Sequence, residues 1–160
     1  MFKIGELFSI ERPKARSVSN YESGEIPFIA SGSFNNGVEK FVASKNEELD
    51  KGHCITISPV DGYAFYQEND FLGRGGAGSS ILILRNSALN KYNAMHICTV
   101  IRKVCSKYNY SNMCSAAKLR EDEILLPTDA NGTPNWKFME NYMMELQKNQ
   151  RDNFVNLQYI

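Results

Sequence analysis

The sequence lacks any long apolar run, and no stretch approaches the roughly 18 consecutive apolar residues that a membrane-spanning helix needs. The first residues, Met1–Glu6, also lack the basic and then apolar segments of a secretory signal peptide. These two absences predict a cytoplasmic protein that does not associate with a membrane.

Closely spaced metal ligands are missing as well. None of the four cysteines belongs to a C-x-x-C pair, and His53 and His96 do not add a second close pair of ligands. Cys98 and Cys105 lie seven residues apart in an apolar helical pattern, where cysteine behaves as a small buried hydrophobe. We therefore expect reduced thiols and neither a structural metal nor a cofactor on this chain.

There is no excess of charge of either sign, because 18 Lys and Arg residues balance 18 Asp and Glu residues. A nonspecific nucleic-acid binder usually carries a strong basic excess, so this balance counts against that class. A protein that binds one DNA sequence is not excluded, since local basic patches matter more than the total.

What the sequence does contain is 42% hydrophobic residues in a chain of 160 residues, which suits one domain with one core. Short apolar and β-branched runs separated by Gly, Ser, Asn and Pro predict several short strands. They are residues 26–30, 38–42, 54–57, 63–66, 81–84 and 124–127, after a turn of helix and a strand within residues 2–10. Together with two helices, they predict an α+β domain with mostly antiparallel strands.

Helical spacing marks two segments. Residues 91–108 place five apolar positions on one face, which predicts a packed helix. Thr133 and Pro134 suit the N-cap and first turn of a second helix. We therefore divide the chain into a domain of residues 1–133, a C-terminal helix of residues 134–149 and a tail of residues 150–160 that we expect to be mobile.

The sequence contains no convincing active site. The Gly-rich residues 73–80 lack the Lys-Ser/Thr end of a phosphate loop and precede a predicted strand instead of a helix. No G-x-S-x-G turn is present, and neither histidine lies in a recognisable base motif. Asp61, Glu68 and Asp70 are not followed by the E-x-K of a metal-dependent nuclease. We expect a module without catalytic activity.

Several polar loops suit contacts to DNA, because Asn pairs with adenine edges and Arg or Lys with guanine edges or phosphates. Each loop taken alone is more often a solvated connection, since turns favour the same residues, but three such loops on one small domain favour DNA contacts. We expect Lys14 and Arg74 to contact phosphates and the asparagines to contact base edges. The full set of candidate contacts is Lys14, Arg16, Asn35, Asn36, Arg74, Lys107, Tyr108, Asn109 and Lys118.

The order of several short segments resembles the DNA target-recognition domain of type I restriction–modification specificity subunits. Ile26–Ile29 and the Asn/Gly-rich loop after it are similar to the family's I-P-(F/Y)-I strand and loop. Lys51–Ser58 is similar to its G-D-I-L-I-S strand, with His53 where Asp is usual. Further resemblances are the opening Gly5–Ile10, the closing L…I-x-L-P strand at Leu119–Pro127, and Ile124–Met143, which resembles type IIB and IIG modules.

The resemblance covers roughly residues 3–146 and implies a non-catalytic domain that reads one half of a bipartite site in double-stranded DNA. It further implies docking to modification subunits, which methylate adenine with S-adenosylmethionine, and to restriction subunits. S-adenosylmethionine and Mg are accordingly expected only on those partner subunits. One alternative is a non-catalytic interaction module that modulates such subunits without binding DNA. Another is a small enzyme with an unrecognised site.

A specificity subunit of this family contains two such domains separated by long helices, whereas this sequence carries one. The last helix resembles the start of such a spacer. The chain is therefore expected to be a half-subunit that pairs with a copy of itself or with a second specificity domain, a fragment, or a lone domain with another role. The candidate pairing face consists of Trp136, Met139, Met143 and Leu146. The sequence leaves open the alternative that this face packs on its own domain.

Overall fold

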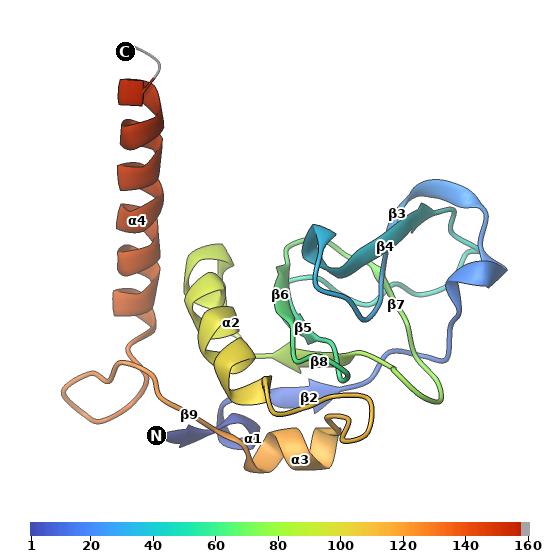
Figure 1. Cartoon of the computed structure of the whole chain (residues 1–160), viewed down its shortest axis with the longest axis horizontal. Coiled ribbons are helices and arrows are strands. Elements are labelled where there is room, and N and C mark those ends of the chain that lie inside the picture. The colour runs from blue at the N-terminus through green and yellow to red at the C-terminus, as the bar shows by residue number, and fades with distance from the viewer. Residues whose placement is uncertain (158–160) are drawn as a thin grey trace.

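The computed structural model describes the backbone of residues 1–157. Figure 1 shows a body of short strands and helices, with one long C-terminal helix alongside it. The α+β class and the mostly antiparallel pairing are confirmed. In chain order the elements are β1 (Phe2–Lys3), α1 (Ile4–Leu7), β2 (Ser9–Glu11), η1 (Val18–Asn20), β3 (Ser23–Ile29), η2 (Asn35–Gly37), β4 (Val38–Val42), β5 (Cys54–Ile57), β6 (Ala64–Gln67), β7 (Leu72–Gly73), β8 (Leu82–Arg85), α2 (Lys91–Cys105), α3 (Ala116–Glu121), β9 (Glu123–Ile124) and α4 (Trp136–Leu157).

The strands form three small sheets. The largest has the order β2-β8-β5-β6 and is antiparallel throughout. A second sheet has the order β4-β3-β7, in which β3 and β7 pair in parallel. The third pairs β1 with β9 and so joins the beginning of the domain to a segment more than a hundred residues later. In the four-stranded sheet, β6 is an edge strand, and the 31–37 loop lies against it.

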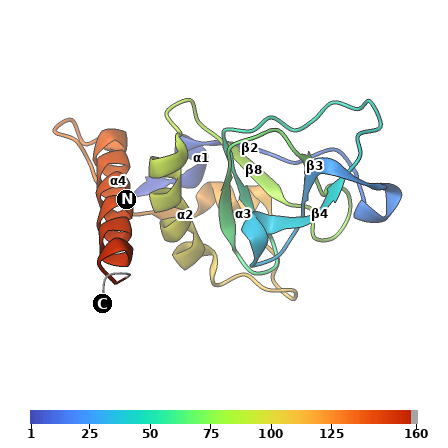
Figure 2. The same ribbon diagram turned by 90° about the horizontal axis from the view of Figure 1, so that it is seen from above.

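The main core lies between α2 and the four-stranded sheet. Every residue of β5 is buried, because β5 is a central strand with neighbours on both sides. From α2, Ile97, Ile101 and Cys105 are buried at helical spacing against this sheet. The helix begins with a capping box in which the Asn90 and Asn93 side chains bond to each other's backbone amides. The amphipathic helix predicted for this segment therefore packs on the four-stranded sheet, and the two together form the scaffold of the domain (Figure 2).

The short helix α3 was not expected from the sequence. The Ser115 side chain caps it by accepting a hydrogen bond from the Lys118 amide, and only Leu119 within it is buried. The predicted strand 124–127 is reduced to β9, which pairs through Phe2↔Ile124 and Lys3↔Glu123. A six-residue helix with one apolar contact leaves no periodic pattern in the sequence.

The C-terminal helix begins later and extends further than expected. Asn135 caps it by accepting a 2.9 Å hydrogen bond from the Phe138 amide, whereas the Thr133 hydroxyl donates to Asp129 at 2.7 Å. Helix α4 continues to Leu157, so residues 150–157 extend the helix rather than forming a separate tail, and residues 158–160 lie outside the described part. No Gly or Pro interrupts this stretch, and its 22 residues span roughly 33 Å.

The first turns of α4 are fixed to the body of the protein. Met139 is fully buried in the main core, and Trp136 makes an edge-to-face contact with Phe8 at 6.3 Å between ring centroids. These two members of the candidate pairing face therefore pack on their own domain. Met143 is half-buried, and Leu146 is 38% exposed. Within residues 1–157, no helix has both the length and the apolar content to cross a bilayer.

Candidate nucleic-acid interface

Polar loops from distant parts of the sequence are joined to one another by hydrogen bonds. The Ser31 hydroxyl donates to the Ser79 carbonyl at 2.9 Å, which links the 31–37 loop to the Gly-rich loop. Arg16 and Gly75 form an antiparallel bridge, which links the Gly-rich loop to the loop after β2. The three loops therefore make one continuous surface.

A fourth loop, residues 107–115, reaches the same region from the end of α2. The Cys114 amide donates to the Pro59 carbonyl at 2.8 Å, next to the turn that leads into β6. Because β6 also receives the 31–37 loop, the two loops lie at the same strand. Three of the four candidate loops are therefore bonded to one another, and the fourth contacts the turn at the opposite end of β6.

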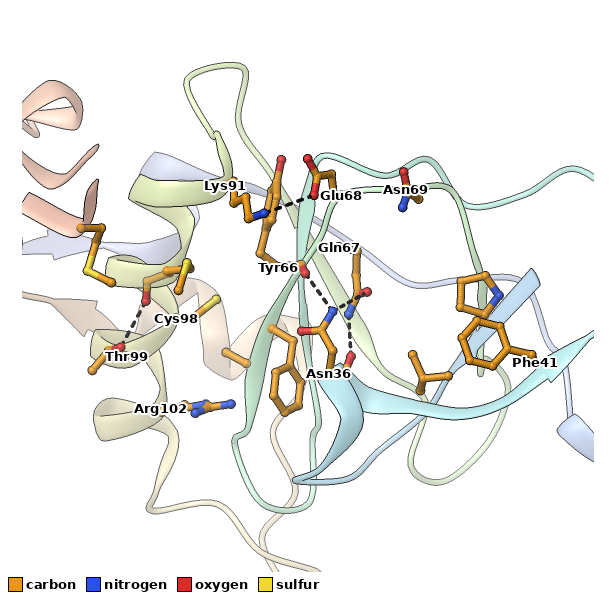
Figure 3. Close-up of a pocket in the computed structure, with 16 residues that line it drawn as sticks. Asn36, Phe41, Tyr66, Gln67, Glu68, Asn69, Lys91, Cys98, Thr99 and Arg102 are labelled. Carbon is orange, nitrogen blue, oxygen red and sulfur yellow. Dashed lines mark hydrogen bonds and ion pairs between the residues drawn. The ribbon is translucent and has the colours of Figure 1, made fainter. Parts of the chain in front are cut away.

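The loop of residues 31–37 is held by a pair of amides. The Asn36 side chain donates to the Tyr66 carbonyl at 3.0 Å and to Gln67 Oε1 at 3.1 Å, and Gln67 Nε2 donates back to the Asn36 carbonyl at 2.9 Å (Figure 3). Asn35 and Asn36 both have positive φ, a conformation that Asn tolerates better than most residues. Asn35 and Asn36 are both exposed, and the bonded side chain of Asn36 positions the loop.

Arg16 is buried within the domain. Its guanidinium bonds to Glu47 at 3.0 Å, to Asp50 at 2.6 Å and to the Glu48 carbonyl at 2.9 Å. These contacts engage the charge of Arg16 within the domain. Arg16 therefore holds the loop after β2 in place and does not face a ligand. The neighbouring Lys14 is exposed and forms only a surface pair with Glu48, at 3.2 Å.

The Gly-rich loop is anchored at both ends of its exposed turn. The Arg74 amide donates to the Ile29 carbonyl at 2.8 Å, and the Arg74 guanidinium bonds to the Ser79 hydroxyl. A Cβ at Gly75 would collide with backbone atoms of Lys14, which explains the glycine at that position. Residues 76–78 are exposed beyond these anchors, and Arg74 itself is half-buried with its charge at their base.

In the loop of residues 107–115, most candidate side chains are engaged within the protein. The Tyr108 hydroxyl donates to buried Asp122 at 2.7 Å, and burial together with this hydrogen bond raises the pKa of Tyr108. Asn109 Oδ1 accepts hydrogen bonds from the amides of Ser111 and Asn112 and so closes a tight turn. Tyr108 and Asn109 therefore shape the loop.

The two lysines near this loop are also paired but remain near the surface. Lys107 forms an ion pair with Asp122. Lys118 Nζ donates to Asn112 Oδ1 at 2.6 Å and lies 5.8 Å from the Tyr108 ring centroid. Tyr110 at the tip of the loop is 82% exposed. The two cations thus lie near the buried Tyr108 ring, and the loop separately exposes the Tyr110 ring at its tip.

A cleft of about 640 Å³ opens between α2, β6 and the β3–β4 hairpin, and it holds an arginine that the sequence analysis missed. The Arg102 guanidinium lies 4.6 Å from the Phe65 ring centroid and 4.9 Å from that of Tyr63. Its Nε atom has no hydrogen-bond partner among the described residues. Tyr63 and Phe65 alternate along a predicted strand, which indicates that their rings lie on the same face. Nothing in the sequence connected α2 to that face.

The Cys54 and Cys98 thiols are poor candidates for chemistry. All four cysteines are buried and unpaired in the part of the chain that the structure describes. Burial raises the pKa of Cys54 and of Cys98 to about 12, which disfavours the nucleophilic thiolate. Across residues 1–157, no group of three or more His, Cys, Asp or Glu side chains is arranged to hold a metal ion.

Comparisons with known proteins identify relatives of the whole chain. Residues 1–156 match the family model of the type I restriction modification DNA specificity domain. The chain is 32% identical over 146 residues to the type II restriction enzyme BgcI specificity subunit S.BcgI of Heyndrickxia coagulans. That match covers 91% of this chain and 42% of the relative, so the chain spans about two fifths of the relative's length.

Two solved structures share the fold. The S subunit of a type I restriction–modification system from M. genitalium superimposes with a TM-score of 0.58 at 15% identity, covering 97% of this chain and 40% of that one. The HsdS subunit of Thermoanaerobacter tengcongensis gives a TM-score of 0.58 at 18% identity, covering 92% and 37%. With the fold, the loop arrangement and the family match in agreement, the chain belongs to the family of type I restriction modification DNA specificity domains.

Proposed function

We propose that this chain recognises a short sequence in double-stranded DNA and directs the modification and restriction subunits of a restriction–modification complex to it. The observation that carries the proposal is the joining of three polar loops to one another on a packed α+β scaffold. Loops held in this way present donors in fixed positions, as sequence reading in a groove requires. The specificity subunit of Heyndrickxia coagulans, similar over 91% of this chain, supports the same role.

The structure divides the candidate residues by role. We assign phosphate contacts to Lys14, Arg74, Lys107 and Lys118, because their charged groups lie at or near the surface. Asn35 is exposed and is assigned to a base edge. Arg16, Asn36, Tyr108 and Asn109 are positioning residues, because their polar groups are bonded within the domain.

Arg102 joins the phosphate contacts in this proposal. A guanidinium stacked on two aromatic rings is held flat and keeps donors for a ligand. Removing its charge should weaken DNA binding of any sequence, whereas removing a base-edge contact should relax the preference at one position.

We also propose that the chain itself is not catalytic, and that methylation and cleavage belong to the partner subunits. Those subunits would bind S-adenosylmethionine and Mg. The buried thiols and the carboxylates engaged by Arg16 leave this face with binding groups instead of activated nucleophiles.

The exposed side of α4 is assigned to assembly. Phe138, Tyr142, Leu146 and Phe154 follow each other at multiples of four residues and are 38–70% exposed. Such an i, i+4 ridge packs into the grooves of another helix. The corresponding helix would come from a second copy of the chain or from a second specificity domain. A two-fold pair would read an inverted repeat, because its half-sites mirror the protein symmetry.

The test is selection of a randomised double-stranded DNA library by the purified full chain, first at low and then at moderate salt. Enrichment of one motif of about three to five base pairs, alone or as an inverted pair, is expected for a domain of this size. Retention of DNA without any motif, or no retention at either salt concentration, would overturn sequence recognition by this chain.

A further inference from the structure

The ring of Phe34 stands out on the candidate face because it is 81% exposed at the tip of the 31–37 loop. Its neighbours in the loop are Ser, Gly and Asn residues. Phe34 belongs to none of the three hydrophobic clusters found among the described residues. The ring therefore contributes little to the packing of its own domain, and its apolar surface is left in water.

The loop that carries Phe34 is closed and anchored. The Ala30 amide donates to the Gly37 carbonyl at 2.9 Å, and the Gly37 amide donates to the Phe34 carbonyl at 2.9 Å. Outside the loop, Ser31 is bonded to Ser79, and Asn36 is bonded to β6. A ring presented on such a loop loses little further conformational entropy when it becomes buried in a ligand.

The backbone just after Phe34 is unusual. Asn35, Asn36 and Gly37 have consecutive φ values of +50°, +56° and +78°. Two non-glycine residues in this region are strained, and the hydrogen bonds between Asn36 and Gln67 hold them there. Strain that the surrounding structure maintains at a surface loop indicates a conformation needed for binding. With the loop in this conformation, the Phe34 ring lies outward in solvent.

We infer that Phe34 is a wedge that inserts between two adjacent base pairs of bound DNA and kinks the duplex. This inference rests on the proposed function and adds the way in which the DNA is deformed. Ser33 and Asn35 flank the ring with hydrogen-bonding groups, and an apolar wedge beside such groups is the chemistry that unstacks a base step. A flexible pyrimidine–purine step is the expected target, because it unstacks at the lowest cost.

The experiment uses the full chain and a duplex that carries the motif selected from the library. 2-Aminopurine is placed at successive positions of the motif, and dyes at the two ends report bending by energy transfer. We expect wild-type protein to raise the 2-aminopurine fluorescence at one step and to shorten the end-to-end distance, as for a kink of about 20–90°. Phe34→Leu should retain both signals, since leucine also serves as a wedge.

Phe34→Ala should bind at least ten times more weakly and give neither signal at saturating protein. Its thermal unfolding midpoint should equal that of the wild type, because the ring is exposed. A straight wild-type complex, or an unchanged kink with Phe34→Ala, would overturn the wedge while leaving sequence recognition intact. If the wild type selects no motif at all, the proposed function fails first and the wedge falls with it. Loss of binding to a modification subunit, with DNA binding unchanged, would instead make Phe34 a protein contact.

Discussion

Gln67 and Asn36 hold each other through reciprocal hydrogen bonds. Gln67 Nε2 donates to the Asn36 carbonyl at 2.9 Å, and Asn36 Nδ2 donates to Gln67 Oε1 at 3.1 Å. Gln67 is 5% exposed, and its amide also bonds to the Thr56 hydroxyl at 2.9 Å. The conformation of an exposed loop thus depends on a buried residue of the neighbouring sheet.

Gln67→Leu should therefore destabilise both the protein and the loop. It leaves the Asn36 carbonyl and the Thr56 hydroxyl without this partner, at an expected cost of about 1–3 kcal/mol in unfolding free energy. Urea unfolding measures the loss, and hydrogen exchange should quicken in residues 30–37. Asn35→Gly is the matched control, since glycine adopts positive φ freely and the loss of the exposed side chain should change stability by less than about 0.5 kcal/mol. Unchanged hydrogen exchange in residues 30–37 of Gln67→Leu would show that the hydrogen bonds between Gln67 and Asn36 do not hold the loop.

The variants of Asn36 separate backbone strain from side-chain bonding. Asn36→Gly removes the side chain but adopts positive φ freely, whereas Asn36→Ala also strains the backbone. We expect the alanine variant to be the less stable of the two by about 1 kcal/mol. In the DNA selection, both should relax the sequence preference, because both release the loop from β6. Specificity profiles identical to wild type would show that Asn36 does not set the preference.

Arg16 and Lys14 should behave in opposite ways although they are two residues apart. Arg16→Ala leaves Glu47 and Asp50 partly buried without their cation, and we expect a loss of about 3–5 kcal/mol in unfolding free energy. Lys14→Ala should leave stability unchanged, because its pair with Glu48 is exposed. It should instead weaken DNA binding and lower the slope of log affinity against log salt by about 1. A stable Arg16→Ala protein with a reduced salt slope would return Arg16 to the DNA contacts.

The sequence predicts the elements whose side chains follow a regular period. β4 and β5 have the predicted bounds, and α2 lies within the predicted helix, because strand alternation and helical spacing are local properties. Helix α3 was missed, since Leu119 is its only buried residue. The extension of α4 was also missed, because an exposed helix needs no apolar stripe over its last turns.

The sequence predicted which loops could contact DNA. It did not predict which of their side chains face outward and which are bonded within the domain. Arg16 meets its carboxylates 31 and 34 residues away, and Asn36 meets Gln67 31 residues away. Such pairings depend on tertiary structure, which no local pattern encodes. The same polar residues that suit DNA contacts also suit turns and caps, so composition alone does not separate the two uses.

Arg74 and Arg102 should supply charge without sequence information. Arg74→Ala and Arg102→Ala are each expected to weaken binding to all sequences and to lower the salt slope by about 1. Lys148→Ala, an exposed change on α4, is the control and should leave both quantities unchanged. Binding titrations over a series of salt concentrations check this. A change in the preferred motif with either arginine variant would instead place that guanidinium on a base.

Stability should fall in alkaline solution because of the buried thiols. Burial raises the pKa of Cys54 and Cys98 from 9.0 to about 12, so the unfolded chain releases these protons first. The stabilisation is complete below pH 9 and is lost as the pH rises towards 12, by about 1.4 kcal/mol per thiol at pH 10. Urea midpoints between pH 7 and 10 measure the slope. The double variant Cys54→Ala, Cys98→Ala should show a shallower slope, and an equal slope would assign the effect to other groups.

Met139 and Leu146 lie on the same helix but should respond differently to a charge. Met139→Asp places a carboxylate at a fully buried position and should prevent folding, because an unpaired buried charge is not tolerated. Leu146→Asp changes a residue that is 38% exposed and should leave the domain folded while preventing helix pairing. Circular dichroism and light scattering after size exclusion separate the two results. A Leu146→Asp protein with the same dimer mass as wild type would remove the ridge from the interface. A monomeric wild type would rule out the second copy and leave a second specificity domain as the partner of α4.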